Sequence, residues 1–106
     1  MKLMTKQLEE RFAQVGKQED AKDPLVIAKF FNPAGAGTWY ATEYHPDDRV
    51  FFGYASIFGD HNDEWGYFSL DELESYKGPF GLGIERDLYW TEKRASQVDI
   101  IAKSFK

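Results

Sequence analysis

The chain has 106 residues, no cysteine and a formal net charge of −5, from 18 acidic and 13 basic residues. This length suits one domain, spanning residues 1–106, and is too short for two. The lack of cysteine excludes disulfide bonds, thiolate metal sites and a cysteine nucleophile. Hydrophobic residues make up 42% and aromatic residues 17% of the chain, so we expect a folded domain with an aromatic core.

The sequence contains no segment that suggests a membrane or an export pathway. No apolar run approaches the roughly 18 residues that cross a bilayer. The polar N-terminal residues lack the uninterrupted apolar stretch of about 7–15 residues that a secretory signal contains. We therefore expect a cytoplasmic protein that does not insert into membranes.

The N-terminal segment has the apolar spacing of an amphipathic helix. One helical stripe is formed by Met4, Leu8, Phe12 and Val15. Thr5 is placed to cap the start of this helix, and Gly16 is placed to end it. Residues 17–24 are polar and finish with a proline, which is typical of a connector.

Five segments of strand type follow, separated by turns rich in glycine, proline, asparagine and aspartate. Their ranges are 25–31, 38–44, 49–58, 65–68 and 84–90. Because strands joined by short turns pair antiparallel, we expect an α+β fold whose sheet is a meander of about five antiparallel strands. Ser69 and Glu72 form a capping box that predicts a short helix at 70–76, and the apolar pattern of 99–105 is compatible with a last helix.

Negative charge is concentrated in the middle of the chain. Residues 38–76 contain nine acidic groups and one basic group, and they are also the most aromatic part of the sequence. One interpretation is a negative surface for a basic protein partner, including one that handles nucleic acid. The candidate residues of this surface are Asp60, His61, Asp63, Glu64 and Trp65. The alternative is that acidic turns keep an aromatic sheet soluble. Direct nucleic-acid binding is disfavoured because the sequence shows no basic stripe.

Strand alternation predicts that two charged side chains point the same way as tryptophans. Arg86 shares the predicted face of Trp90, and Glu43 shares the predicted face of Trp39. A charge on an apolar face is costly unless it is paired, so we expect Arg86 to pair with Glu43 or with a carboxylate of the helix at 70–76. Such a pair would fix the strand register. The alternative is a ligand pocket between the two tryptophans, with Arg86 binding an anion.

The sequence gives only weak signs of a metal site, a catalytic histidine or a phosphate-binding loop. The loop at 60–64 has acidic residues at alternate positions, as calcium loops do, but the glycine those loops need is replaced by Trp65. The two histidines, His45 and His61, lie in predicted turns and give no catalytic arrangement. The glycine-rich loop at 78–83 leads into a strand, whereas phosphate loops lead into a helix. We therefore predict no catalytic residue, no metal and no cofactor.

A set of short segments, taken together, resembles a known family. In chain order these segments are residues 1–8 (MKLMTKQL), 29–31 (KFF), 38–44 (TWYATEY), 51–53 (FFG), 64–73 (EWGYFSLDEL) and 81–89 (GLGIERDLY). They resemble the bacterial family labelled domain of unknown function 2958 over nearly the whole chain. The resemblance implies a small bacterial cytoplasmic protein, often encoded on plasmids, integrative elements and phage-like regions. It implies no established activity, cofactor or catalytic residue.

These observations lead to one expected function and two alternatives. We expect a non-enzymatic protein-interaction domain of mobile-element biology, which binds a basic, nucleic-acid-handling partner. Occupying the basic groove of a host defence protein is the most specific form of this expectation. The first alternative is a small-ligand-binding or catalytic domain with a pocket around Arg86 and Glu43. The second is an accessory binder of single-stranded nucleic acid through aromatic stacking.

Overall fold

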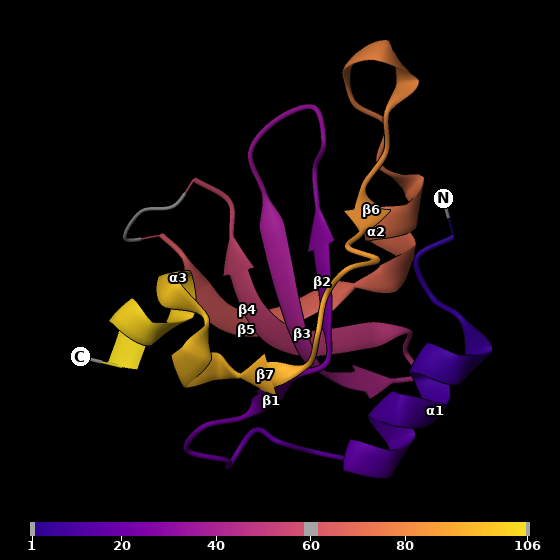
Figure 1. Ribbon diagram of the computed structural model, residues 1–106. Helices are drawn as coiled ribbons and strands as arrows, with labels where there is room; N and C mark the ends of the chain where they lie inside the picture. Colours follow the sequence, from indigo (N-terminus) through magenta and orange to yellow (C-terminus); the bar gives the residue numbers. More distant parts are fainter. Residues whose placement is uncertain (1, 59–61, 106) are drawn as a thin grey trace.

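The computed structural model describes residues 2–58 and 62–105 (Figure 1). Helices and strands follow in the order α1 (Lys6–Val15), β1 (Leu25–Val26), β2 (Ala28–Phe31), β3 (Thr38–His45), β4 (Val50–Ser56), β5 (Glu64–Ser69), α2 (Leu70–Ser75), β6 (Glu85–Arg86), β7 (Lys93–Arg94) and α3 (Asp99–Ala102). This order confirms the predicted α+β fold. No helix within the described ranges is long and apolar enough to cross a membrane.

The main sheet has five antiparallel strands in the order β5-β4-β3-β2-β6. Strands β2 to β5 form the predicted meander, because each is joined to the next by a short loop. Strand β6 comes from much later in the chain and pairs with β2, so it closes the other edge of the sheet. Strands β1 and β7 form a separate two-stranded ribbon.

Two predicted strands are shorter than expected. The segment 25–31 is interrupted at Ile27, so that β1 leaves the main sheet and only β2 belongs to it. The segment 84–90 contributes only the two residues of β6. A turn ends this strand, because the side chain of Asp87 accepts a hydrogen bond from the backbone N–H of Tyr89 at 2.9 Å.

Both predicted caps of α1 are confirmed. The hydroxyl of Thr5 accepts a hydrogen bond from the backbone N–H of Leu8 at 3.1 Å. At the other end, Gly16 has a φ of 74° and its N–H binds the carbonyl of Phe12. The predicted N-cap of α2 is also present, since the hydroxyl of Ser69 accepts a hydrogen bond from the N–H of Glu72.

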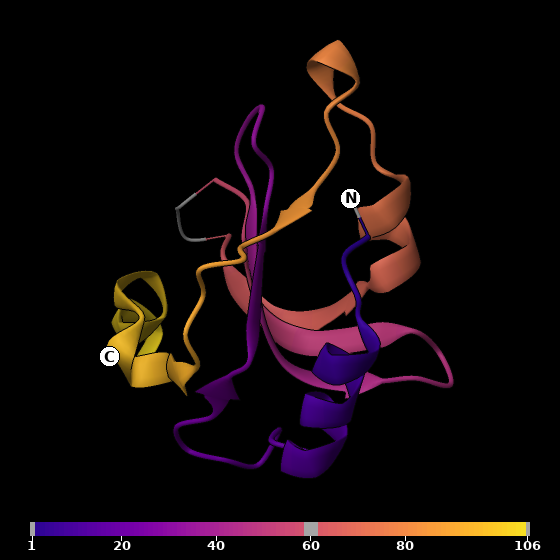
Figure 2. The ribbon, with the colours of Figure 1, turned by 45° about the vertical axis from the view of Figure 1, so that its right-hand side comes forward.

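The sheet carries a core on each of its two faces. Helices α1 and α2 cover one face and α3 covers the other, as the edge-on view in Figure 2 shows. We call them the α1 face and the α3 face. The α1 face includes Phe30, Trp39, Ala41 and Phe51. The α3 face includes Tyr40, Tyr54 and Trp65.

A β-bulge in β3 changes which residues share a face. Ala41 lies opposite Gly53, but the next paired residue is Glu43, which lies opposite Phe52. The extra residue, Thr42, interrupts the alternation, so Glu43 lies on the α3 face. The prediction that Glu43 shares the face of Trp39 is therefore wrong, because simple alternation assumes a strand without a bulge.

Candidate functional site

The four residues of the predicted pocket are divided between the two faces of the sheet. Arg86 lies opposite Phe30, which lies opposite Trp39, so Arg86 and Trp39 share the α1 face. Trp90 lies beyond the end of β6 on the α3 face, where its ring packs 5.9 Å from that of Tyr40. Because Glu43 also lies on the α3 face, the predicted common pocket and the predicted pairing of Arg86 with Glu43 are wrong.

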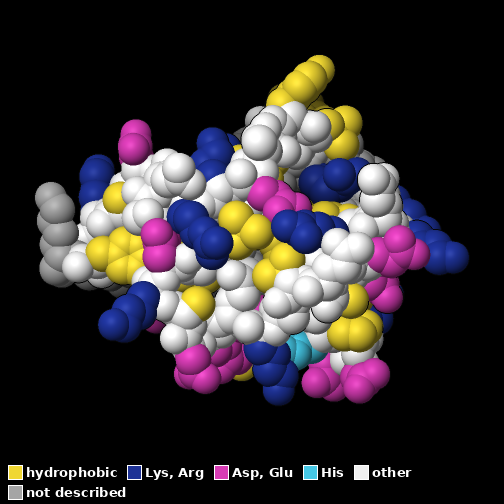
Figure 3. All heavy atoms as spheres, turned by 60° about the horizontal axis from the view of Figure 1, so that its bottom comes forward, with side chains coloured by type: hydrophobic (Ala, Val, Ile, Leu, Met, Phe, Trp, Pro, Cys, Tyr) yellow, Lys and Arg dark blue, Asp and Glu magenta, His cyan; other side chains and the backbone are white. Residues whose placement is uncertain are grey.

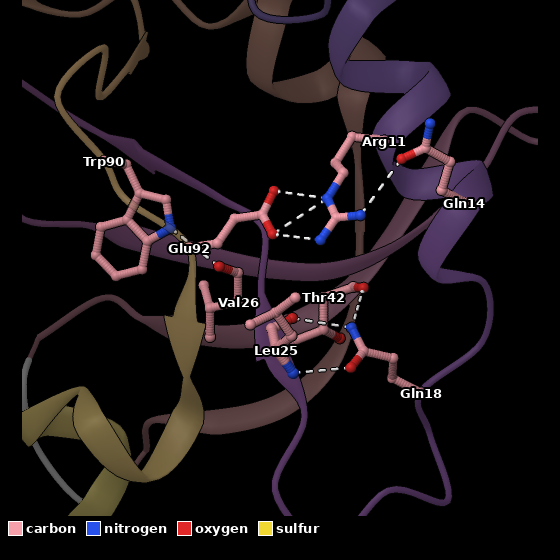
Figure 4. Close-up of polar contacts among 8 residues, drawn as sticks. All are labelled: Arg11, Gln14, Gln18, Leu25, Val26, Thr42, Trp90 and Glu92. Atoms are coloured by element: carbon pink, nitrogen blue, oxygen red, sulfur yellow. Dashed lines mark hydrogen bonds and ion pairs between the residues drawn. The ribbon is translucent and has the colours of Figure 1, made fainter.

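Arg86 lies beside α1 in a surface cleft that also contains Arg11 and Glu92. The guanidinium of Arg11 donates to both carboxylate oxygens of Glu92, with distances of 2.8 to 3.1 Å (Figure 4). Glu92 raises the pKa of Arg11 through these hydrogen bonds. The ion pair ties α1 to the segment that leads into β7, so this cleft has a clear structural role.

The acidic residues of the middle segment that the structure describes do not form one surface. Glu43 is buried, and Arg49 binds Asp71 and Glu74 at 2.7 and 3.4 Å. The turn between β3 and β4 lies at one end of β4, whereas Glu64 at the start of β5 pairs with Ala55 near the other end of that strand (Figure 1). Figure 3 shows acidic and basic side chains interspersed on the bottom of the molecule. The described acidic groups are therefore too dispersed to act as a single negative patch.

Part of the predicted interaction surface belongs to the fold. Asp60 and His61 lie outside the described residues. Trp65 is half-buried on the α3 face, with its ring 5.4 Å from that of Tyr54. Glu64 is exposed at the start of β5 and lies opposite Ala55, on the α1 face. Of the described residues of the predicted surface, Glu64 is the most available to a partner.

In contrast to the dispersed acidic residues, several apolar side chains line a single groove on the α1 face. It has a volume of about 350 Å³ and lies between α2 and the sheet. We call it the α2 groove, and its apolar walls are Trp39, Ile57, Phe68, Leu73, Tyr76 and Ile84. Gly66 lies beside it on the same face, and a methyl group added there would meet no atom within 4 Å. This part of the sheet is therefore open, whereas α1 covers the lower part.

Two apolar residues that line the α2 groove, Ile57 and Tyr76, are exposed, and further exposed apolar residues follow β4 and α2. Ile57 and Phe58 follow β4 and are 37% and 72% exposed. Tyr76, Phe80 and Leu82 follow α2 and are exposed as well, and the Tyr76 hydroxyl lies 3.4 Å from Asn32 in the β2–β3 turn. Exposed apolar residues gathered around one groove are typical of an interaction site. Sequence reasoning missed it because it followed the charged residues of the same loops.

A polar cluster lies on the opposite side of the sheet, at the end of β3. Glu43 and His45 are two residues apart beyond the bulge, so both lie on the α3 face, and Glu43 Oε1 is 3.1 Å from His45 Nε2. Glu19, from the connector after α1, brings a carboxylate oxygen within 4.8 Å of both. The hydroxyl of Tyr67 donates a hydrogen bond to Glu19. We call Glu19, Glu43 and His45 the polar cluster.

Gln18 holds the connector in place next to this cluster. Its backbone N–H donates to Glu43 Oε2 at 2.6 Å. Its side-chain amide donates to the carbonyls of Leu25 and Thr42 and accepts from the N–H of Leu25, over 2.7 to 2.9 Å (Figure 4). Gln18 is buried, so these bonds fix the backbone from which Glu19 projects. The spacing of Glu43 and His45 could have been found in the sequence, but not their meeting with Glu19.

A comparison with family models decides the classification. A model described as a protein of unknown function (DUF2958) matches residues 3–103. The chain belongs to the DUF2958 family. The resemblance predicted from the short segments is therefore confirmed. No curated protein and no solved structure matches the chain.

In this DUF2958 chain, Asp63 is engaged with the α3 face. Its carboxylate accepts a hydrogen bond from the hydroxyl of Ser56 at 2.8 Å. Burial, followed by the charge of Asp63, raises the pKa of Tyr40 and of Tyr54. The contact with Ser56 joins Asp63, at the approach to β5, to the end of β4, which makes it a structural residue.

Proposed function

We propose that this DUF2958 protein is a non-enzymatic protein-interaction domain whose α2 groove binds a partner segment with an apolar anchor and a neighbouring basic residue. The observation that carries this proposal is the open apolar groove, whose lining includes the exposed side chains of Ile57 and Tyr76. Apolar side chains on a partner would displace water from the groove, and this is the main source of affinity in protein recognition.

The charge around the α2 groove supports a basic partner. Glu72 lines the groove, and Glu64 lies on the same face beyond Ala55 and Trp39. Both carboxylates are exposed, and neither forms an ion pair with any other residue in the described ranges. A lysine or arginine next to the apolar anchor would meet these carboxylates, which favours correct partners and faster association.

The sequence-based expectation of a basic, nucleic-acid-handling partner fits this occupant. The proposed binding surface is the α2 groove, whereas the sequence predicted the acidic loop at residues 60–65. In a cytoplasmic bacterial protein of a mobile element, such binding would act in conjugation, replication or counter-defence. In the last case, the domain would block a basic surface that a host protein uses on nucleic acid.

A displayed library of random peptides tests this proposal with a defined probe. The full chain is used for selection, and the double variant Ile57→Ser/Glu72→Lys is used for counter-selection. We expect enriched peptides to contain a large apolar residue within a few positions of lysine or arginine. Their affinity should fall with added salt, because exposed charge pairs are screened.

Matched controls locate the binding site. Tyr89 is 95% exposed in the turn after β6, outside the α2 groove, so Tyr89→Ser should leave binding unchanged. Asp99→Lys makes the same charge change as Glu72→Lys at the start of α3 and should also leave binding unchanged. Enrichment of acidic peptides, equal binding to the groove variant, or preferential binding of single-stranded oligonucleotides would overturn the proposal.

A further inference from the structure

The polar cluster contains a carboxylate oxygen and an imidazole nitrogen that face each other without forming a hydrogen bond. Glu43 Oε1 and His45 Nε2 are buried and lie 3.1 Å apart. Within the described ranges, neither atom has a hydrogen-bond partner, because their alignment does not suit one. Glu43 itself is only 2% exposed. A buried carboxylate oxygen is costly unless a positive group lies beside it, and a bound cation or a protonated His45 imidazole would supply that charge.

From this geometry we propose that Glu19, Glu43 and His45 bind a divalent transition-metal ion of the Zn²⁺ class. Atoms that bind one ion at about 2.0–2.2 Å lie roughly 3.0–3.6 Å from each other. The separation of Glu43 Oε1 and His45 Nε2 falls in this range. The Glu19 oxygen lies within 4.8 Å of both atoms, and this side chain is exposed, so a small rotation brings it to the ion.

The donor set determines the class of ion. One imidazole nitrogen and two carboxylate oxygens suit Zn²⁺, Mn²⁺ or Fe²⁺. Ca²⁺ and Mg²⁺ prefer sites made of oxygen alone, so the histidine disfavours them. Two carboxylates also supply the negative charge that neutralises a divalent cation.

The groups behind the ligands hold them in position. The backbone N–H of Gln18 donates to Glu43 Oε2, which leaves Oε1 directed at His45. The hydroxyl of Tyr67 donates to Glu19 and restrains that side chain. Hydrogen bonds of this kind orient metal ligands and strengthen binding.

Glu43 and His45 of the polar cluster line a surface cleft, and Glu19 is itself exposed to solvent. The cleft has a volume of about 250 Å³ and is also lined by the acidic turn residues Asp47 and Asp48. Lys17 also lines this cleft, but it forms no ion pair with the cluster within the described part of the chain. Three protein ligands leave further coordination positions for water, as in other open metal sites.

The test is metal binding by the full chain after treatment with a chelator. Zn²⁺, Mn²⁺ and Ca²⁺ are titrated separately by calorimetry, and the melting temperature is measured with and without each ion. We expect one Zn²⁺ per chain and a rise in melting temperature, because binding to the folded state stabilises it. Ca²⁺ should give no such rise.

Variants assign the ligands. His45→Gln and Glu43→Gln should each weaken Zn²⁺ binding by at least about tenfold. His61→Gln, at the other histidine of the chain, is the matched control and should bind as the natural chain does. Because Glu19 is exposed, Glu19→Gln should fold normally and still weaken binding, which keeps the test valid if the buried variants unfold.

Three outcomes would overturn the proposal. The first is that Zn²⁺ does not bind. The second is that His45→Gln binds as well as the natural chain while His61→Gln does not. The third is that Zn²⁺ does not change the melting temperature of the natural chain, whereas Glu43→Gln lowers the melting temperature even in the absence of metal. Glu43 and His45 would then form only a structural ion pair.

Discussion

At the scale of single residues, the bulge of β3 depends on a close approach between two strands. A Cβ atom built on Gly53 would lie 1.9 Å from the carbonyl oxygen of Tyr40, which is far inside contact distance. Only glycine therefore permits β4 to approach β3 next to the bulge. The bulge in turn sends Glu43 to the α3 face, where it meets His45.

This close approach gives a stability prediction with an internal control. Gly53→Ala should lower the free energy of unfolding by about 1–3 kcal/mol, because the new methyl group forces the strands apart. Gly66→Ala should have a much smaller effect, since that methyl group would enter open space. Urea unfolding of both variants measures the difference. Equal stability of the two would contradict the described register.

Gln18 shows how one side chain can join separate elements. It bonds to the backbone of Leu25 at the start of β1 and of Thr42 at the bulge of β3. Gln18→Leu would leave these buried backbone groups without partners, so we expect a loss of about 1–3 kcal/mol in the free energy of unfolding. Gln14→Leu, at an exposed position of α1, is the control and should change stability little. Thermal or urea unfolding that fails to separate these variants would contradict the anchoring role.

At the scale of the elements, signals that act within a few residues were read correctly from the sequence. The caps at Thr5, Gly16 and Ser69 each depend on a neighbour three or four residues away, and all three are present. The turns that separate β2 to β5 were likewise visible as glycine, proline, asparagine and aspartate. These local signals are why the helices and the antiparallel sheet could be predicted.

Features that depend on distant contacts could not be predicted. The bulge at Thr42 is defined by how β3 pairs with β4, and one extra residue reverses the face of every later side chain. The prediction for Glu43 failed for this reason. Trp90 was misplaced because β6 ends at the Asp87 turn, and the meeting of Glu19 with His45 requires the connector to fold back on the sheet.

The same connector is tied to the C-terminal segment by a contact that depends on pH. The carboxylate of Asp23 accepts from the N–H and the hydroxyl of Ser96 at 2.9 and 2.6 Å. These bonds lower the pKa of Asp23, the side-chain hydrogen bond having the larger effect. A carboxylate with a lowered pKa stabilises the fold above its ordinary value of about 3.9, and the stabilisation is lost as pH falls through the folded-state value.

Asp23→Asn tests this contact. At pH 7 the variant should unfold at a lower urea concentration than the natural chain, because the ionised acceptor is missing. The difference between the urea midpoints of the variant and the natural chain should become smaller as the pH is lowered below about 4. A difference in urea midpoint that stays constant from pH 7 to pH 3 would show that the charge of Asp23 does not contribute to stability.

At the scale of the whole molecule, the sheet separates two features with different chemistry. The α2 groove lies on the α1 face and is apolar, with Glu64 and Glu72 near it. The polar cluster lies on the α3 face and is held by Gln18 and Tyr67. Because the two do not share side chains, variants of one should leave the other unaffected. Loss of Zn²⁺ binding in His45→Gln should therefore leave peptide binding intact.

The central claim is that the α2 groove is the surface that holds a protein partner. The most direct measurement is photo-cross-linking inside the cell, with a benzophenone amino acid placed at Ile57 in one strain and at Tyr89 in another. We predict a cross-linked basic protein from position 57 that disappears when Glu72→Lys is added, and none from position 89. Equal cross-linking from both positions, or a product unaffected by Glu72→Lys, would contradict the claim.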